Sequence, residues 1–95
     1  MEVVYTETFG NWLRRLRDPR AKAVIVSRIE RIEDGNFGDR KSVGGGVSEL
    51  RIDVGKGYRV YYTIRRRAAV VLLCGGDKSR QQRDVRRARQ IAEQL

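Results

Sequence analysis

Arginines at alternate positions of two short segments carry the clearest chemical signal in this sequence. Arg51 lies in ELRID and Arg59 in GYRVYY, and both alternate with apolar residues. Guanidinium groups donate paired hydrogen bonds to phosphate oxygens, so two of them on one face suit an anionic substrate. Tyr61 adds a ring that can stack on a base. Glu49 completes the pattern and suits two roles, a general base for a 2′-hydroxyl or an ion-pair partner of a nearby arginine such as Arg51.

A second candidate anion site follows the last apolar segment, in the stretch CGGDKSR. We expect Gly75 and Gly76 to break a buried strand, and Ser79 to cap the final helix. Backbone amides at a glycine turn and a helix start favour an anion, and Lys78 and Arg80 lie in that corner. The alternative is a structural corner in which the glycines only turn the chain, Asp77 or Ser79 caps the helix, and Lys78 is solvated.

Composition narrows the classes of function. The 95 residues include 21 lysines and arginines and 12 acids, for a formal net charge of +9. This charge favours a polyanion or an acidic protein as partner. The absence of histidine excludes catalysis by Ser/His/Asp or Cys/His groups and ordinary zinc sites, and we expect no metal and no cofactor. Cys74, the single cysteine, lies in an apolar segment and is expected to be buried.

The hydrophobic pattern predicts one domain over residues 1–95, of α+β class with the order β-α-α-β-β-β-α. A short strand precedes two helices that form a hairpin, the first capped by Thr6 and the second by Asp18. Alternation then predicts two paired strands, and an arginine turn at 65–67 leads to a central strand at 68–74 and a final helix. No segment resembles a signal sequence or a membrane span, so we expect a cytoplasmic protein.

The two alternating strands predict one apolar face and one polar face. A three-residue turn over residues 55–57 pairs Asp53 with Arg59 and Arg51 with Tyr61. We therefore expect a polar, basic and aromatic face that is open to solvent.

The segments ELRIDVGKGYRVYY and LLCGGDKSRQQRDV resemble toxins of the RelE/ParE superfamily of bacterial type II toxin–antitoxin systems, most closely the HigB-like addiction module killer branch. The segment FGNWLRRLRDPRAKAVIVSRIERIEDGNFGDRKSVGGGV resembles the N-terminal half of that branch, so the resemblance covers nearly the whole chain. It implies a small, antiparallel-rich RelE-like sheet with helices packed on it. It also implies metal-independent cleavage of mRNA, usually on the ribosome, and neutralisation by an antitoxin that often carries a helix-turn-helix.

The resemblance also implies roles for individual residues. Arg59 matches a basic residue that contacts the scissile phosphate, Lys78 falls near a second one, and Lys41 falls in a loop that contributes lysines in some members. Those members place a tyrosine or histidine after the final strand, and here the segment SRQQRDVRRARQIAEQL has neither. The expected catalytic residues are Arg59, Lys78, Arg51 and Glu49, and the expected RNA-binding residues are Lys41, Tyr61, Arg80 and Arg40.

These observations lead to a ribosome-associated endoribonuclease toxin, in which the 2′-hydroxyl of the RNA attacks the adjacent phosphate. Two alternatives stay open. One is a gyrase inhibitor on the same fold, and the other is a non-catalytic basic module that binds nucleic acid or the antitoxin.

Overall fold

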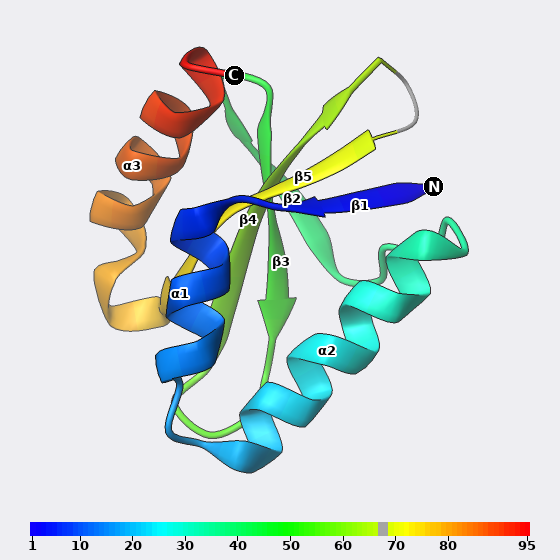
Figure 1. Cartoon of the computed structure of the whole chain (residues 1–95). Coiled ribbons are helices and arrows are strands. Elements are labelled where there is room, and N and C mark those ends of the chain that lie inside the picture. Colours follow the sequence, from blue (N-terminus) through cyan, green and yellow to red (C-terminus); the bar gives the residue numbers. More distant parts are fainter. Residues whose placement is uncertain (67–68) are drawn as a thin grey trace.

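The computed structural model describes residues 1–66 and 69–95 and shows an α+β fold (Figure 1). The strands are β1 (Glu2–Tyr5), β2 (Arg40–Gly44), β3 (Val47–Ile52), β4 (Tyr58–Arg65) and β5 (Ala69–Asp77). The helices are α1 (Glu7–Arg15), α2 (Pro19–Glu33) and α3 (Gln81–Glu93), with a short 3₁₀ turn, η1 (Lys78–Arg80), before α3. The predicted class and order are confirmed, with β2 added in the glycine-rich segment. Arg67 and Ala68, which the sequence assigned to a turn and a strand, lie outside the described residues.

All five strands form one sheet in the order β1-β5-β4-β3-β2. Strands β2 to β5 pair antiparallel in sequence order, and β1 pairs parallel with β5. Strand β1 ends opposite Leu72, so the C-terminal part of β5 extends beyond it, and α1 follows β1 directly and packs on β5.

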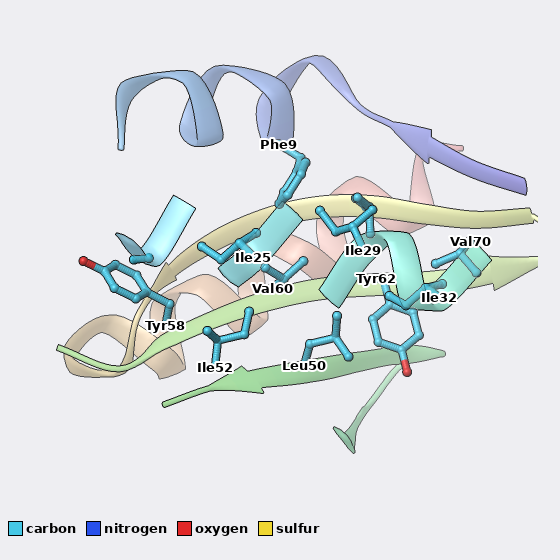
Figure 2. Close-up of a cluster of buried hydrophobic side chains, with 12 residues drawn as sticks. Phe9, Ile25, Ile29, Ile32, Leu50, Ile52, Tyr58, Val60, Tyr62 and Val70 are labelled. Carbon is cyan, nitrogen blue, oxygen red and sulfur yellow. The ribbon is translucent and has the colours of Figure 1, made fainter. Parts of the chain in front are cut away.

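The sheet lies between helices on both faces, with α2 and α3 on opposite sides (Figure 1). Residues of α1 and α2 cover one face, where Figure 2 shows Ile25, Ile29 and Ile32 against side chains of the sheet. Helix α3 covers the other face through Ala88 and Ala92. Helix α3 therefore covers the polar face of the β3–β4 hairpin, so the expectation that this face is open to solvent is wrong. Among the described helices, none is long and apolar enough to cross a membrane.

The starts of the first two helices follow the predicted caps. The hydroxyl of Thr6 accepts a hydrogen bond from the Phe9 amide at 3.1 Å, and Asp18 accepts one from the Ala21 amide at 3.0 Å. Of the two caps considered before the last helix, Ser79 is wrong and Asp77 is the capping side chain, which accepts a hydrogen bond from the Ser79 amide at 2.9 Å. This cap starts the 3₁₀ turn, and α3 begins at Gln81.

The β3–β4 hairpin differs from its predicted register by two residues. Strand β3 ends at Ile52 and β4 begins at Tyr58, so five residues join them, and Arg51 lies opposite Arg59 rather than Tyr61. The wider turn uses Gly55 and Gly57 in the left-handed region, with φ of +57° and +80°. A two-residue slip keeps every side chain on its predicted face, although it leaves Asp53 exposed in the turn.

Gly75 and Gly76 lie inside β5 rather than at its end, and they pair with Val60 and Arg59 of β4. A Cβ atom at Gly75 would lie 2.4 Å from Trp12 Cε3, and one at Gly76 would lie 2.0 Å from Oδ2 of Asp84. The two glycines therefore let side chains of α1 and α3 approach the strand from its two faces. The predicted strand break and glycine-turn anion cradle are wrong.

We predict that Gly75→Ala destabilises the protein by about 1–3 kcal/mol, because the added methyl group overlaps the Trp12 ring. Gly10→Ala is the matched control, since Gly10 lies inside α1 and a Cβ atom there would have nothing within 4 Å, and alanine should stabilise the helix by about 0.5–1 kcal/mol. Urea unfolding of both variants checks the pair. Equal stability of Gly75→Ala and the unaltered protein would contradict the close packing.

Candidate functional site

A buried carboxylate links β3, β4 and the start of α3. Glu49 is 1% exposed, and its Oε1 lies 3.4 Å from Arg51 Nε. Its Oε2 lies 3.7 Å from Arg59 Nε and accepts a hydrogen bond from Gln81 Nε2 at 2.9 Å. The predicted pairing of Glu49 with Arg51 is confirmed, and we call these four residues the Glu49 cluster.

Arg51 and Arg59 face each other directly across the two strands. Like charges at such positions repel, and the carboxylate between them offsets this repulsion. The Arg51 side chain is 35% exposed and the Arg59 side chain 13%. Arg59 also donates to the Tyr58 carbonyl oxygen at 3.1 Å, while its Nε has no hydrogen bond within residues 1–66 and 69–95. The pair presents positive charge and donor groups at the edge of the α3-covered face, which suits a phosphate.

The two basic residues of β2 lie on opposite faces of the sheet. Lys41 pairs with Glu49, so it shares the face of the Glu49 cluster and is exposed. Arg40 pairs with Leu50 on the other face, where its guanidinium carbon lies 4.5 Å from the centre of the Phe37 ring. The structure brings Lys41 toward the candidate site and does not bring Arg40 there.

Tyr61 is fully buried beneath α3, although the sequence placed its ring on an open face. Burial, with Glu49 and Asp84 nearby, raises the pKa of Tyr61 well above its usual range. The expectation that this ring stacks on a base is therefore wrong, because α3 covers it. Cys74 is buried as predicted, and burial raises the pKa of its thiol to about 12, so it stays protonated at neutral pH.

Lys78 and Arg80 are exposed and line a shallow pocket of about 460 Å³ at the start of α3. The Lys78 amide donates to the Gly57 carbonyl oxygen at 3.1 Å, which holds η1 against the β3–β4 turn. Gln81 lines the same pocket and reaches Glu49, so it joins this basic corner to the Glu49 cluster. The corner thus contains the predicted basic residues Lys78 and Arg80, but its backbone belongs to η1 and α3 and not to a glycine turn.

Besides Gln81 of the Glu49 cluster, one more residue of the candidate site was not predicted from the sequence, Asp84. It is 3% exposed and lies over Gly76, the strand neighbour of Arg59. Burial raises the pKa of its carboxyl, an effect that Arg83 and Arg87 partly offset. The available signal was its spacing, because Asp84 precedes Ala88 and Ala92 at four-residue intervals on the buried side of the helix.

Metal ligands are not gathered at this site. Across the described ranges 1–66 and 69–95, no three residues of the types His, Cys, Asp and Glu come together in a way that could hold a metal ion.

Two comparisons with known proteins bear on this geometry. Residues 11–95 match the family described as "Phage derived protein Gp49-like (DUF891)". The chain is also 50% identical over 95 residues to an uncharacterized protein of Haemophilus influenzae (strain ATCC 51907 / DSM 11121 / KW20 / Rd), and the alignment covers 100% of this chain and 96% of that relative. The family match includes every residue of the Glu49 cluster, as well as Lys41, Lys78 and Asp84.

We predict that Glu49→Gln destabilises the protein by about 1–3 kcal/mol, because it removes the negative charge between two facing arginines. Salt should change this loss only slightly, because Glu49 and Arg59 are largely removed from solvent. Asp53→Asn, in the exposed β3–β4 turn, makes the same charge change and should alter stability by no more than about 0.5 kcal/mol. Urea unfolding at low and high salt measures both, and equal effects of the two substitutions would contradict the account.

We predict that Asp84→Asn raises the melting temperature at pH 7. Burial makes the pKa of the Asp84 carboxyl higher in the folded than in the unfolded state. The stability of the protein therefore falls as the pH rises from the ordinary pKa of 3.8 through the pKa of the folded state. The amide cannot ionise, so the advantage of the variant should vanish below about pH 4. Melting curves from pH 3 to pH 8 test this, and a difference that does not change with pH would refute it.

Proposed function

Because the chain belongs to the Gp49-like family of phage-derived proteins, which is related to toxin–antitoxin systems, we propose that it is a toxin that cleaves mRNA on the ribosome. In this proposal residues 1–95 are one toxin domain of the RelE/ParE superfamily, within its HigB-like branch. A cognate antitoxin, which carries a helix-turn-helix, neutralises it in a hetero-oligomer. The five-stranded sheet with helices on both faces supports this placement.

The observation that carries the proposal is the pairing of Arg51 and Arg59 around a buried carboxylate. Two guanidinium groups fixed side by side match the non-bridging oxygens of one phosphate. Because Glu49 and the Tyr58 carbonyl hold these groups before substrate binds, little reorganisation is needed when charge develops on the phosphate.

The proposed reaction uses the 2′-hydroxyl of the RNA as nucleophile. Its oxygen bonds to the adjacent phosphorus while the bond from phosphorus to the 5′-oxygen breaks. The hydroxyl proton leaves for a base, and the departing 5′-oxygen takes up a proton. The products are a 2′,3′-cyclic phosphate and a 5′-hydroxyl, and Arg51 and Arg59 stabilise the negative charge that builds up on the phosphate oxygens.

The other residues of the site take supporting roles. Glu49 is buried and already contacts Arg51 and Gln81, so in this proposal it positions the arginines and does not act as the base. Lys78, Arg80 and Lys41 are exposed around the cluster and hold neighbouring phosphates of the RNA. Tyr61 is left out because it is buried, and Arg40 because it lies on the other face.

We predict that the chain, induced without its antitoxin, arrests growth and cleaves mRNA while DNA supercoiling stays normal. Arg51→Ala should abolish the arrest, because losing one donor to transition-state charge lowers the rate by about 10²- to 10³-fold. Lys78→Ala should weaken the arrest less. Arg20→Ala, at an exposed position of α2 on the other side of the sheet from α3, removes the same charge and should leave the arrest intact.

Three measurements on the same cultures distinguish the candidate functions: growth, mRNA integrity and plasmid supercoiling. Collapse of supercoiling with intact mRNA would favour a gyrase inhibitor. Unaffected growth would favour a module that only binds nucleic acid or the antitoxin. A folded Arg51→Ala variant that keeps full toxicity would remove this arginine from the site.

A further inference from the structure

A groove of about 690 Å³ lies at the end of the sheet where α1 leads into α2, and it shares no residue with the Glu49 cluster. The end of α1 and its link to α2 form one wall, and the β3–β4 turn forms the other (Figure 1). Trp12, Leu16 and Tyr58 line the groove, and the first two are only partly buried. Apolar side chains at the centre of a groove suit an apolar side chain of a partner.

Three basic side chains also line this groove. Arg15, Arg17 and Lys56 are exposed, and none of them forms an ion pair within residues 1–66 and 69–95. Their positive charges are therefore available to carboxylates or phosphates of a partner.

Two acids line the groove as well, and both of them cap the start of a helical segment. Asp18 accepts a hydrogen bond from the Ala21 amide at the start of α2, and Asp77 accepts one from the Ser79 amide at η1. Backbone amides at such starts carry partial positive charge, which offsets the charge of the carboxylates. The groove therefore presents a net positive rim around an apolar centre.

The shape of the apolar centre favours a protein segment over RNA. The rings of Trp12 and Tyr58 are inclined at 62° with their centroids 6.4 Å apart, and Tyr58 is only 6% exposed, so the two rings do not form a flat platform for a base. Leu16 adds an aliphatic surface, which suits a side chain of a protein. A second copy of this chain is an unfavourable partner, because each copy carries a net charge of +9.

We propose that this groove binds an acidic segment of the antitoxin, which packs one large apolar side chain against Trp12 and Leu16 and places its carboxylates against the three basic residues. The proposal rests on the proposed function, since it takes the antitoxin as the partner. The occupant follows from the chemistry of the groove, because a positive rim matches an acidic segment and an apolar centre matches an apolar anchor.

The groove adjoins the basic corner that contains Lys78. The Lys78 amide donates to the Gly57 carbonyl oxygen at 3.1 Å, and a Cβ atom at Gly57 would lie 3.2 Å from Lys78 Cδ. An acidic segment in the groove therefore lies beside a residue that we propose to hold an RNA phosphate. Its negative charge disfavours RNA at this corner, which is one way in which an antitoxin lowers the activity of the site.

Trp12 is the single tryptophan of the chain, so its fluorescence reports the binding of peptides that contain no tryptophan. The probes are three capped hexapeptides: EELFEE, EESSEE, which has the same charge without the apolar residues, and KKLFKK, which has the opposite charge. We expect EELFEE to change the Trp12 emission with a Kd about tenfold or more below that of EESSEE, the range set by burial of one large apolar side chain. KKLFKK should leave the emission unchanged. Equal Kd values for the two acidic peptides, or no change with any peptide, would overturn the proposal.

Trp12 also lines two smaller pockets, so a variant at a residue that lines only the groove locates the bound peptide. Arg17→Glu should raise the Kd of EELFEE about fivefold, because an attractive charge becomes a repulsive one. Arg31→Glu is the matched control, since it makes the same charge change at an exposed position in the last turn of α2 and should alter the Kd by no more than about twofold. Equal effects of the two substitutions would show that the peptide binds elsewhere and would overturn the proposal.

A tetramer of 2′-O-methyl uridine tests RNA as the alternative occupant. If this tetramer changes the Trp12 emission and EELFEE does not, and if Arg17→Glu removes the change, the groove binds RNA and the proposal is wrong.

The peptide experiment is independent of cleavage. A protein that cleaves mRNA but does not distinguish EELFEE from EESSEE keeps the proposed function and loses the docking groove. A protein that binds EELFEE selectively but cleaves nothing keeps the groove and loses the nuclease.

Discussion

The ion pairing of Glu49 is the interaction on which the candidate site depends. Arg51 and Arg59 are direct neighbours across β3 and β4, an arrangement that is unfavourable unless a negative charge lies between them. The carboxylate is almost entirely removed from water, so its charge is weakly screened. Gln81 bonds to the same carboxylate, which ties the start of α3 to the sheet. The hydrogen bond between Gln81 and Glu49 therefore belongs both to the packing of α3 on the sheet and to the candidate site.

Gly75 and Gly76 of β5, the strand on the other side of β4 from β3, also determine how the helices contact the sheet. Gly76 admits Asp84 from α3, while Gly75 admits Trp12 from α1 on the other face. A polar layer thus forms beneath the first turns of α3, with Glu49 over β3 and Asp84 over β5 on either side of Arg59. The two acids are buried within a chain of net charge +9, so the positive charge stays largely on the surface, where the proposed function requires it.

Local patterns predicted the elements well and their contacts less well. The helices of the N-terminal half followed from their caps and apolar spacing, because Thr6 and Asp18 act within a few residues of their own positions. The hairpin register slipped by two residues because either turn length keeps the same faces. The burial of Tyr61 and the purpose of the glycine pair depended on where α3 lies, which is a property of the whole fold. The burial of Asp84 was not predicted, because a charged residue interrupts the apolar spacing of a helix face whose other buried residues are alanines.

The chemistry of the RNA ends is the most direct measure of the central claim, that Arg51 and Arg59 promote attack by the 2′-hydroxyl. The substrate is an RNA that the induced protein cuts at one known position, prepared with either a hydroxyl or a 2′-O-methyl group at that nucleotide. The account predicts a 2′,3′-cyclic phosphate or 3′-phosphate end from the first RNA and no cleavage of the second. A 3′-hydroxyl end, or cleavage of the methylated RNA, would contradict it.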